Sequence, residues 1–374
     1  MEETDKNPKH LLIVRLSAMG DVAMLPHAIR ALRTQYPDLR VSVATRALFR
    51  PFFEGLGVEI LEVDTRSTHR GLRGIWRLAC EARRAGVDAV ADVHGVVRSI
   101  LFSTIMRLMG RNVAFIRKGR IEKWFRLGYS SSEAVPLKHT VVRYCDVFRR
   151  LGFTFDDPAP VTERPALESP MGEKTGTWVG FAPFSAHAGK TYPEPLRSEV
   201  VRLLSERYDR IFIHSGGGKE QLFAEKMESL YPNVTALFGR VSLDEELALI
   251  AHLDCVVSMD SLVMHLGALV ATPVVSVWGA THPELGFLGY GCDAEGVLQS
   301  EIPCRPCSVY GNKPCKTGDY RCIHAITPEM VVERVARLIE KSHAESELID
   351  SDSSDYDSNT EPTSKERESM VTEV

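Results

Sequence analysis

The sequence predicts an α/β protein built from two Rossmann-like domains, each with a parallel sheet. Short apolar strands alternate with amphipathic helical stretches in both halves of the 374-residue chain. Strands separated by helices form parallel βαβ units with right-handed crossovers. Between the halves, the stretch DDPAPVTERPALESPMGEKTGT contains four prolines and mixed charge, which is typical of a linker. The chain is long enough for two domains of ordinary size.

The elements follow in order along each half. In the first half we expect strands at 11–16, 40–45, 87–94 and 112–116, and a helix at 22–37 with Leu25, Ile29 and Leu32 on one face. In the second half we expect strands at 177–183, 210–216, 234–238, 255–260 and 273–279. Helices are expected near 196–208 and at 219–231, 242–253, 261–271 and 327–342.

These elements divide the chain into five segments. Residues 1–10 are a polar start, 11–160 the amino-terminal domain, 161–176 the linker, and 177–342 the carboxy-terminal domain. Residues 343–374 contain ten acidic residues against Lys365 and Arg367. This last segment has too little apolar surface to fold, so we expect a disordered acidic tail.

Composition indicates a soluble globular protein, with 44% hydrophobic and 25% charged residues and a net charge of −5. The polar start and the short apolar run after it match neither a signal peptide nor a membrane span. Eight cysteines without such a signal indicate a reducing compartment with free thiols or a metal. We therefore expect a cytoplasmic protein, either free or associated with the inner membrane face.

The stretch LLIVRLSAMGDV places a carboxylate, Asp21, just after the first strand. Ligands of open α/β sheets bind beyond the carboxyl ends of the strands, and two such domains on one linker place those ends across a cleft. Asp21 is thus expected to face the cleft. The alternative is that Asp21 only caps the next helix, where aspartate is favoured.

Two loops after strands of the second half carry polar side chains. FSAHAGKTYPE offers Ser185 and Lys190, and GGGKE offers Glu220, which could accept hydrogen bonds from a ribose. Three glycines allow a ligand close to the backbone, although the Walker spacing is absent. The alternatives are a solvated lysine and a flexible turn.

A third group lies in VSMDSLVMHLGALVATPVV. Asp260 and Ser261 stand between a strand and a helix, and His265 follows near the first turn of that helix. Free N–H groups at a helix start suit a pyrophosphate. Alternatively, Asp260 caps the helix and His265 is satisfied in the core.

Four motifs in order resemble glycosyltransferase family 9, the lipopolysaccharide heptosyltransferases. LLIVRLSAMGDVAMLPHAIRALRTQYPD is similar to that family's opening strand, S-x-x-G-D-V loop and helix, and DVHGVVRS to its D-x-x-G-x-x-[KR]-S segment. AGKTYPE resembles K-x-[WY]-P. DSLVMHLGALVATPVVSVWGATHPE resembles D-[ST]-G-x-x-H-x-A-x-x-x-G-x-P followed by G-x-T-x-P. The resemblance spans roughly residues 11 to 340.

The resemblance implies a GT-B fold, with a nucleotide-sugar donor, typically ADP-L-glycero-D-manno-heptose, in the carboxy-terminal domain and a lipid-linked acceptor in the other. It implies an inverting heptose transfer to a lipopolysaccharide core or related glycolipid, with no metal or cofactor required for catalysis. Asp21 would be the general base, and Lys190 would neutralise the diphosphate leaving group. The other implied residues are Ser185, Glu220, Asp260, Ser261 and His265 for the donor, and Arg15, Gly20, Asp92 and Arg98 for the acceptor.

These residue types suit the chemistry. Displacement at an anomeric carbon passes through an oxocarbenium-like state, as in glycoside hydrolysis. The reaction needs a base on one side and a cationic, donor-rich site for the departing phosphates on the other.

The chain departs from the family pattern at Leu262, where glycine is usual, and at His282, where aspartate is common. Both differences bear on which nucleotide sugar is the donor. Two rival functions stay open: a nucleotide-sugar 2-epimerase of the same fold, and a catalytically silent sugar-binding member. The S-x-x-G-D-V loop argues against the epimerase, and Leu262 favours the silent member.

The segment 98–129 carries eight Lys/Arg and one acid, Glu122, among apolar residues. It predicts either a solvated basic face or peripheral contact with an anionic membrane surface. No nucleic-acid-binding module is recognisable, so nucleic acid is not an expected partner.

Four cysteines, Cys304, Cys307, Cys315 and Cys322, cluster before the last helix. One C-x₂-C pair with two further thiols could hold a structural zinc ion.

Overall fold

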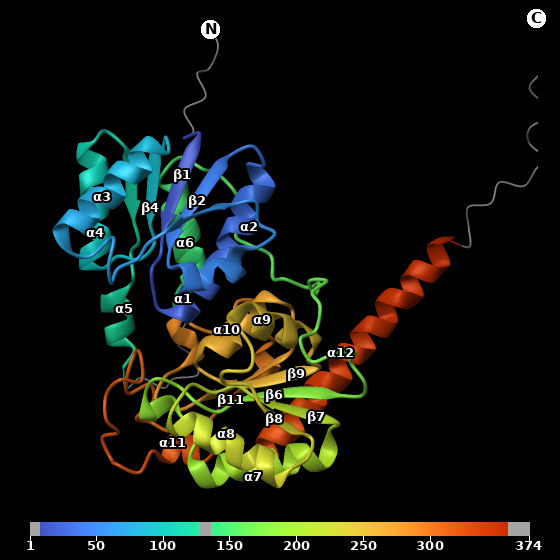
Figure 1. The fold of residues 1–374 in the computed structure, drawn as a ribbon. Helices are drawn as coiled ribbons and strands as arrows, with labels where there is room; N and C mark the ends of the chain where they lie inside the picture. The colour runs from blue at the N-terminus through green and yellow to red at the C-terminus, as the bar shows by residue number, and fades with distance from the viewer. Residues whose placement is uncertain (1–7, 128–135, 358–374) are drawn as a thin grey trace, which may run out of the picture.

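The computed structural model describes residues 8–127 and 136–357 and consists of two lobes, each built on a parallel sheet (Figure 1). The first sheet has the strand order β3-β2-β1-β4-β5 and the second the order β11-β10-β9-β6-β7-β8. The strands of the first sheet are β1 (His10–Val14), β2 (Arg40–Thr45), β3 (Glu59–Glu62), β4 (Ala89–Asp92) and β5 (Asn112–Phe115). Those of the second are β6 (Trp178–Ala182), β7 (Arg210–Ile213), β8 (Val234–Ala236), β9 (Cys255–Met259), β10 (Val274–Trp278) and β11 (Val297–Gln299).

Helices cover both faces of each sheet, as in doubly wound folds. The first lobe has α1 (Met19–Ala23), α2 (Leu25–Gln35), α3 (Gly71–Arg84), α4 (Val97–Leu108), α5 (Arg120–Phe125), α6 (Thr140–Arg149) and the 3₁₀ helix η1 (Ala47–Phe53). The second has α7 (Glu194–Arg207), α8 (Lys219–Leu230), α9 (Leu243–His252), α10 (Leu262–Leu269), α11 (Arg321–His324) and α12 (Pro328–Asp357). Its 3₁₀ helices are η2 (Ala188–Lys190), η3 (Pro283–Leu285) and η4 (Ala294–Gly296).

Alternation along β1 assigns the two faces of the first sheet. Leu11 and Ile13 pack in one core with α2 and α6, whereas Leu12 and Val14 pack in another with α3 and α4. Successive side chains of a strand point to opposite faces. The helices α3 and α4 therefore lie together on one side of the sheet.

The structure corrects three expectations about elements. The single helix expected at 22–37 is two helices, because Pro26 occupies the first turn of α2, where its missing N–H costs nothing. The edge strands β3 and β11 were not expected, and both are short. Helix α12 runs to Asp357, so residues 343–357 are helical rather than disordered. A helix that is already nucleated extends at little cost per residue; residues 358–374 lie outside the described part, as do residues 1–7.

The two lobes meet along α1 and α10 and through the segment before α6. The Leu137 N–H donates to the Glu284 carbonyl at 2.9 Å, and Thr140 Oγ1 donates to the Gly286 carbonyl at 2.9 Å. Lys123 Nζ lies 3.9 Å from the centroid of the Phe287 ring. These contacts hold the ends of the two sheets toward one another.

Candidate active site

A cavity of about 640 Å³ lies between the lobes, beyond the ends of β1, β6 and β9. The strand order reverses between β1 and β4 in one sheet and between β6 and β9 in the other, and ligands bind at such reversals. Most predicted site residues line this cavity: Gly20, Asp21, Ser185, Lys190, Glu220, Asp260, Ser261 and His265.

Asp21 lies in the first turn of α1 and combines the two roles expected of it. Its Oδ2 accepts a hydrogen bond from the Ala18 N–H at 3.4 Å, which is a helix-capping contact. The same oxygen forms an ion pair with Arg15 Nη2. The carboxylate keeps 29% of its surface exposed, and the residue borders the interlobe cavity.

Arg15 holds the Asp21 carboxylate in place through their ion pair. Its side chain is buried, and Nη1 donates to the Val93 carbonyl at 2.6 Å. The Tyr144 hydroxyl donates to the Asp21 carbonyl at 3.0 Å. Arg15 is not among the residues that line the cavity, and its ion pair orients the Asp21 carboxylate. Its predicted contact with the acceptor stays a prediction.

Lys190 supplies a cation from the second lobe. Its Nζ lies 3.2 Å from Asp260 Oδ2, and both side chains are largely buried. Thr281 Oγ1 donates to the same oxygen at 2.8 Å. Because an anionic carboxylate would repel a diphosphate, we expect Asp260 to position Lys190. Its predicted place among the donor-binding residues stays a prediction.

His265 lies on α10 against the amino-terminal lobe. Burial lowers its pKa to about 4, so the ring is neutral near pH 7. Its Nδ1 is buried and has no hydrogen-bond partner within the described residues. His265 therefore offers a hydrogen bond, but no charge, to a ligand. Helix α10 starts at Leu262 after Ser261, whose side chain makes no capping bond, which leaves the first N–H groups available.

The Gly-rich loop is held by Glu220, whose Oε2 accepts from the Gly216 N–H at 2.8 Å. Beside it, His214 Nδ1 and Glu246 Oε1 are 2.7 Å apart, and both residues line the cavity. The sequence motifs did not single out this pair, although His214 directly follows the strand β7. Phe184, Phe287 and Tyr310 also line the cavity; the last two come from irregular segments without periodicity.

Two further predicted acceptor residues lie elsewhere. Asp92 is fully buried, and burial raises the pKa of its carboxyl. Its Oδ1 accepts from the His94 and Gly95 N–H groups, which fixes the turn after β4. Arg98 Nη1 donates to the His69 carbonyl at 2.7 Å. Neither side chain lines the interlobe cavity, and each is engaged in a structural contact. Their predicted role in acceptor binding stays a prediction.

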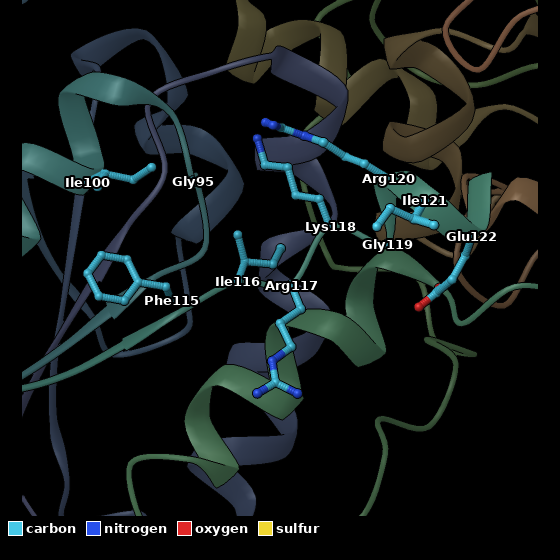
Figure 2. A pocket seen from close by; sticks show the side chains of 10 residues that line it. All are labelled: Gly95, Ile100, Phe115, Ile116, Arg117, Lys118, Gly119, Arg120, Ile121 and Glu122. Carbon is cyan, nitrogen blue, oxygen red and sulfur yellow. The ribbon is translucent and has the colours of Figure 1, made fainter. Parts of the chain in front are cut away.

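A second cavity of about 690 Å³ lies in the first lobe between α4 and α5 (Figure 2). Ile100, Phe115 and Ile116 supply apolar walls. Lys118 and Arg120 extend in the same direction, whereas Arg117 points away from them (Figure 2). Burial lowers the pKa of Lys118, and Asp21 is among the charges acting on it.

Fold and site together define a glycosyltransferase of the GT-B type: two doubly wound lobes, a cleft between them, a carboxylate from one lobe and a lysine and a helix start from the other. The chain belongs to glycosyltransferase family 9 (heptosyltransferase), whose sequence model matches residues 75–317. The predicted family and enzyme class are thus confirmed.

Curated relatives cover most of the chain. Lipopolysaccharide heptosyltransferase 1 of Pseudomonas aeruginosa is 23% identical over 317 residues, which is 79% of this chain and 85% of the relative. The protein of the same name from Escherichia coli O18:K1:H7 is 24% identical over 314 residues, covering 78% of this chain and 94% of the relative.

Solved structures confirm the two-lobed fold. The family 9 glycosyl transferase of Veillonella parvula superposes with a TM-score of 0.68 at 17% identity, covering 91% of this chain and 99% of that one. The E. coli ADP-heptose lipopolysaccharide heptosyltransferase II gives 0.64 at 18% identity, covering 89% and 99%.

Proposed function

We propose that this enzyme transfers a heptose from ADP-heptose to a lipopolysaccharide core or related glycolipid, with inversion and with Asp21 as the general base. One observation carries the proposal: Asp21 of one lobe and Lys190 of the other border the same cavity. The E. coli heptosyltransferase WaaC, 20% identical with a TM-score of 0.60, has been solved with ADP-2-deoxy-2-fluoro heptose. Lys190 and the free N–H groups at the start of α10 suit the diphosphate of a sugar nucleotide of that class.

The proposed reaction is one displacement. The acceptor hydroxyl oxygen bonds to the anomeric carbon as the bond from that carbon to the diphosphate oxygen breaks, and the hydroxyl proton passes to Asp21. Negative charge grows on the departing diphosphate, where Lys190 and the N–H groups at the start of α10 stabilise it. Because this chain supplies that positive charge itself, we propose that no cofactor is required.

The acceptor enters from the first lobe. Lys118 is close enough to Asp21 for their charges to interact, and it borders the cavity between α4 and α5. Cationic side chains over apolar walls suit a sugar that carries carboxylate or phosphate groups. We therefore assign Lys118 and Arg120 to anionic groups of the acceptor.

The test is Asp21→Asn, assayed by mass spectrometry of the product with ADP-heptose and a panel of other nucleotide sugars. A positioned base contributes roughly 10²–10⁴-fold, and we expect a loss in kcat of that size. ADP affinity, measured by titration calorimetry, should stay unchanged. Asp38→Asn, at an exposed carboxylate, is the matched control. Wild-type rates in Asp21→Asn refute the base, and ADP binding without any product from the wild type identifies a silent member.

A structural zinc ion at the four clustered cysteines is a separate proposal. Cys304, Cys307, Cys315 and Cys322 border one small cavity. Burial raises the pKa of Cys307 and Cys322, which favours their protonated form. Within residues 8–127 and 136–357, no group of three or more His, Cys, Asp or Glu side chains is arranged to hold a metal. Elemental analysis of untagged protein decides whether zinc binds.

A further inference from the structure

Exposed apolar side chains gather on three helices of the first lobe. Trp76 on α3 is 56% exposed and Trp124 on α5 is 64% exposed. The other large exposed apolar residues of these helices are Leu72, Val97, Ile100, Leu108, Ile121 and Phe125. Together with Trp76 and Trp124 they form what we call the α3–α5 face.

Helical spacing places these residues in stripes. Leu72 and Trp76 are four residues apart on α3, while Ile75 and Leu78 of the same helix pack into the core below. On α4, Val97, Ile100 and Leu108 share the outward side, and Phe102 and Met106 the inward side. The outer stripes therefore lie outside the core that packs this side of the lobe.

The three helices lie on one flank of the first lobe, with the cavity of Figure 2 between α4 and α5. The core contacts place α3 and α4 on the same side of the first sheet, and Ile100 of α4 and Ile121 of α5 border the same cavity. Figure 1 shows α3, α4 and α5 along one flank of the molecule. An apolar patch of this kind marks an interaction site.

The charge around the patch has one sign. Arg70, Arg73 and Arg77 are exposed beside the α3 stripe. Arg120 is exposed on α5, where it also borders the cavity between α4 and α5. The three helices contain two acids, Glu81 and Glu122, and each is already paired, with His69 at 3.0 Å and with Arg143 at 2.7 Å. Beside the α3 and α5 stripes, exposed arginines thus outnumber the acids of these helices.

We infer that the α3–α5 face docks this enzyme on an anionic lipid bilayer. Tryptophan and arginine around exposed aliphatic side chains are suited to the headgroup region, where rings lie at the interface and guanidinium groups meet lipid phosphates. None of the helices in the described part of the chain has the length and apolarity to cross a membrane, so attachment through this face is peripheral. The sequence of the segment 98–129 predicted such contact, and the structure adds α3 to the surface concerned. Residues 128 and 129 lie outside the described part.

This inference is independent of the proposed sugar transfer, since it predicts binding to vesicles that contain neither donor nor acceptor. We would measure co-sedimentation with phosphatidylcholine vesicles and with vesicles that also contain phosphatidylglycerol. Wild-type protein should bind the second kind, and added salt should release it. Each arginine near such a surface contributes roughly fivefold in partitioning, so Arg73→Gln/Arg77→Gln should lower binding roughly thirtyfold.

Fluorescence gives a readout specific to this face. The chain has four tryptophans; Trp178 and Trp278 are fully buried, whereas Trp76 and Trp124 lie on the face. Anionic vesicles should shift the emission to the blue, and Trp76→Phe/Trp124→Phe should remove the shift.

The matched controls lie on α8 of the other lobe. Leu222→Ser/Leu230→Ser and Lys219→Gln/Lys226→Gln change exposed side chains of the same kinds, and both should bind vesicles as the wild type does. Circular dichroism and urea denaturation confirm that each variant is folded. Equal binding to neutral and anionic vesicles, loss of binding in the α8 variants, or a dimer that the tryptophan variants dissociate would each overturn the inference.

Discussion

Gly20 of the first lobe lies against His265 of the second so closely that a Cβ at position 20 would come within 2.8 Å of His265 Cδ2. The glycine thus allows α1 and α10 to meet beside the cavity that both residues line. Gly20→Ala should force these helices apart, at a cost of about 1–3 kcal/mol in the free energy of unfolding, as is usual for overpacking. Urea denaturation measures this cost, and KM for the donor should rise because the cavity loses its shape.

The contact itself can be tested by removing the ring. In a His265→Ala background the added methyl group meets no imidazole, so Gly20→Ala should then cost little stability. A cost that is the same in both backgrounds would show that the strain arises elsewhere.

Lys190 and Asp260 should act as one unit in ADP binding. Under the proposed function, Lys190 forms hydrogen bonds to phosphate, and such bonds contribute about 1.5–3 kcal/mol. The ADP affinity of Lys190→Met should therefore fall roughly 10- to 150-fold. Asp260→Asn keeps the size of the side chain but releases the lysine from its 3.2 Å ion pair. We expect a smaller loss from this variant in the wild-type background and almost none in the Lys190→Met background.

Titration calorimetry with ADP measures all four proteins of this cycle. Lys226→Met, at an exposed lysine of α8, is the matched control and should bind ADP normally. A rise in affinity in Asp260→Asn would contradict the positioning role, because it would mean that the carboxylate chiefly repels the ligand.

Much of the site follows from two local rules. The strand predicted for RVSVAT at 40–45 matches β2 residue for residue. Polar residues after β1, β6 and β9 converge because the carboxyl ends of parallel strands share an edge. The sequence alone therefore predicts that Asp21, Lys190 and Asp260 lie at the cleft, and all three line the interlobe cavity.

Other features depend on partners distant in sequence. In the sequence, Arg15 is part of a short apolar strand and gives no sign of its role. It orients Asp21 because its side chain is held by the Val93 carbonyl and the Tyr144 ring, which lie far along the chain. Asp92 belongs to a family-like motif, but burial commits it to the turn after β4. Phe287 and Tyr310 lie in irregular segments, where neither helical nor strand periodicity gives a signal.

The buried histidine should make stability depend on pH. Burial lowers the pKa of His265 from 6.5 to about 4, so between these values the unfolded chain binds a proton that the folded protein excludes. Stability is therefore highest above pH 6.5 and is lost as the pH falls toward 4. Between about pH 7 and about pH 5, this one group should account for about 2 kcal/mol of the free energy of unfolding.

The measurement compares urea denaturation of the wild type and His265→Gln at both pH values. The variant should be less stable at neutral pH, because Gly20 and the cavity lose a packed ring, but its stability should fall less on acidification. Burial also lowers the pKa of His27 to about 3 and that of His94 to about 4. Both residues are present in both proteins, so they contribute equally to the two pH dependences. His343→Gln, at an exposed histidine of α12, should keep the wild-type pH dependence. If His265→Gln and the wild type lose equal stability on acidification, His265 does not exclude a proton on folding, and the assignment of a neutral His265 ring is wrong.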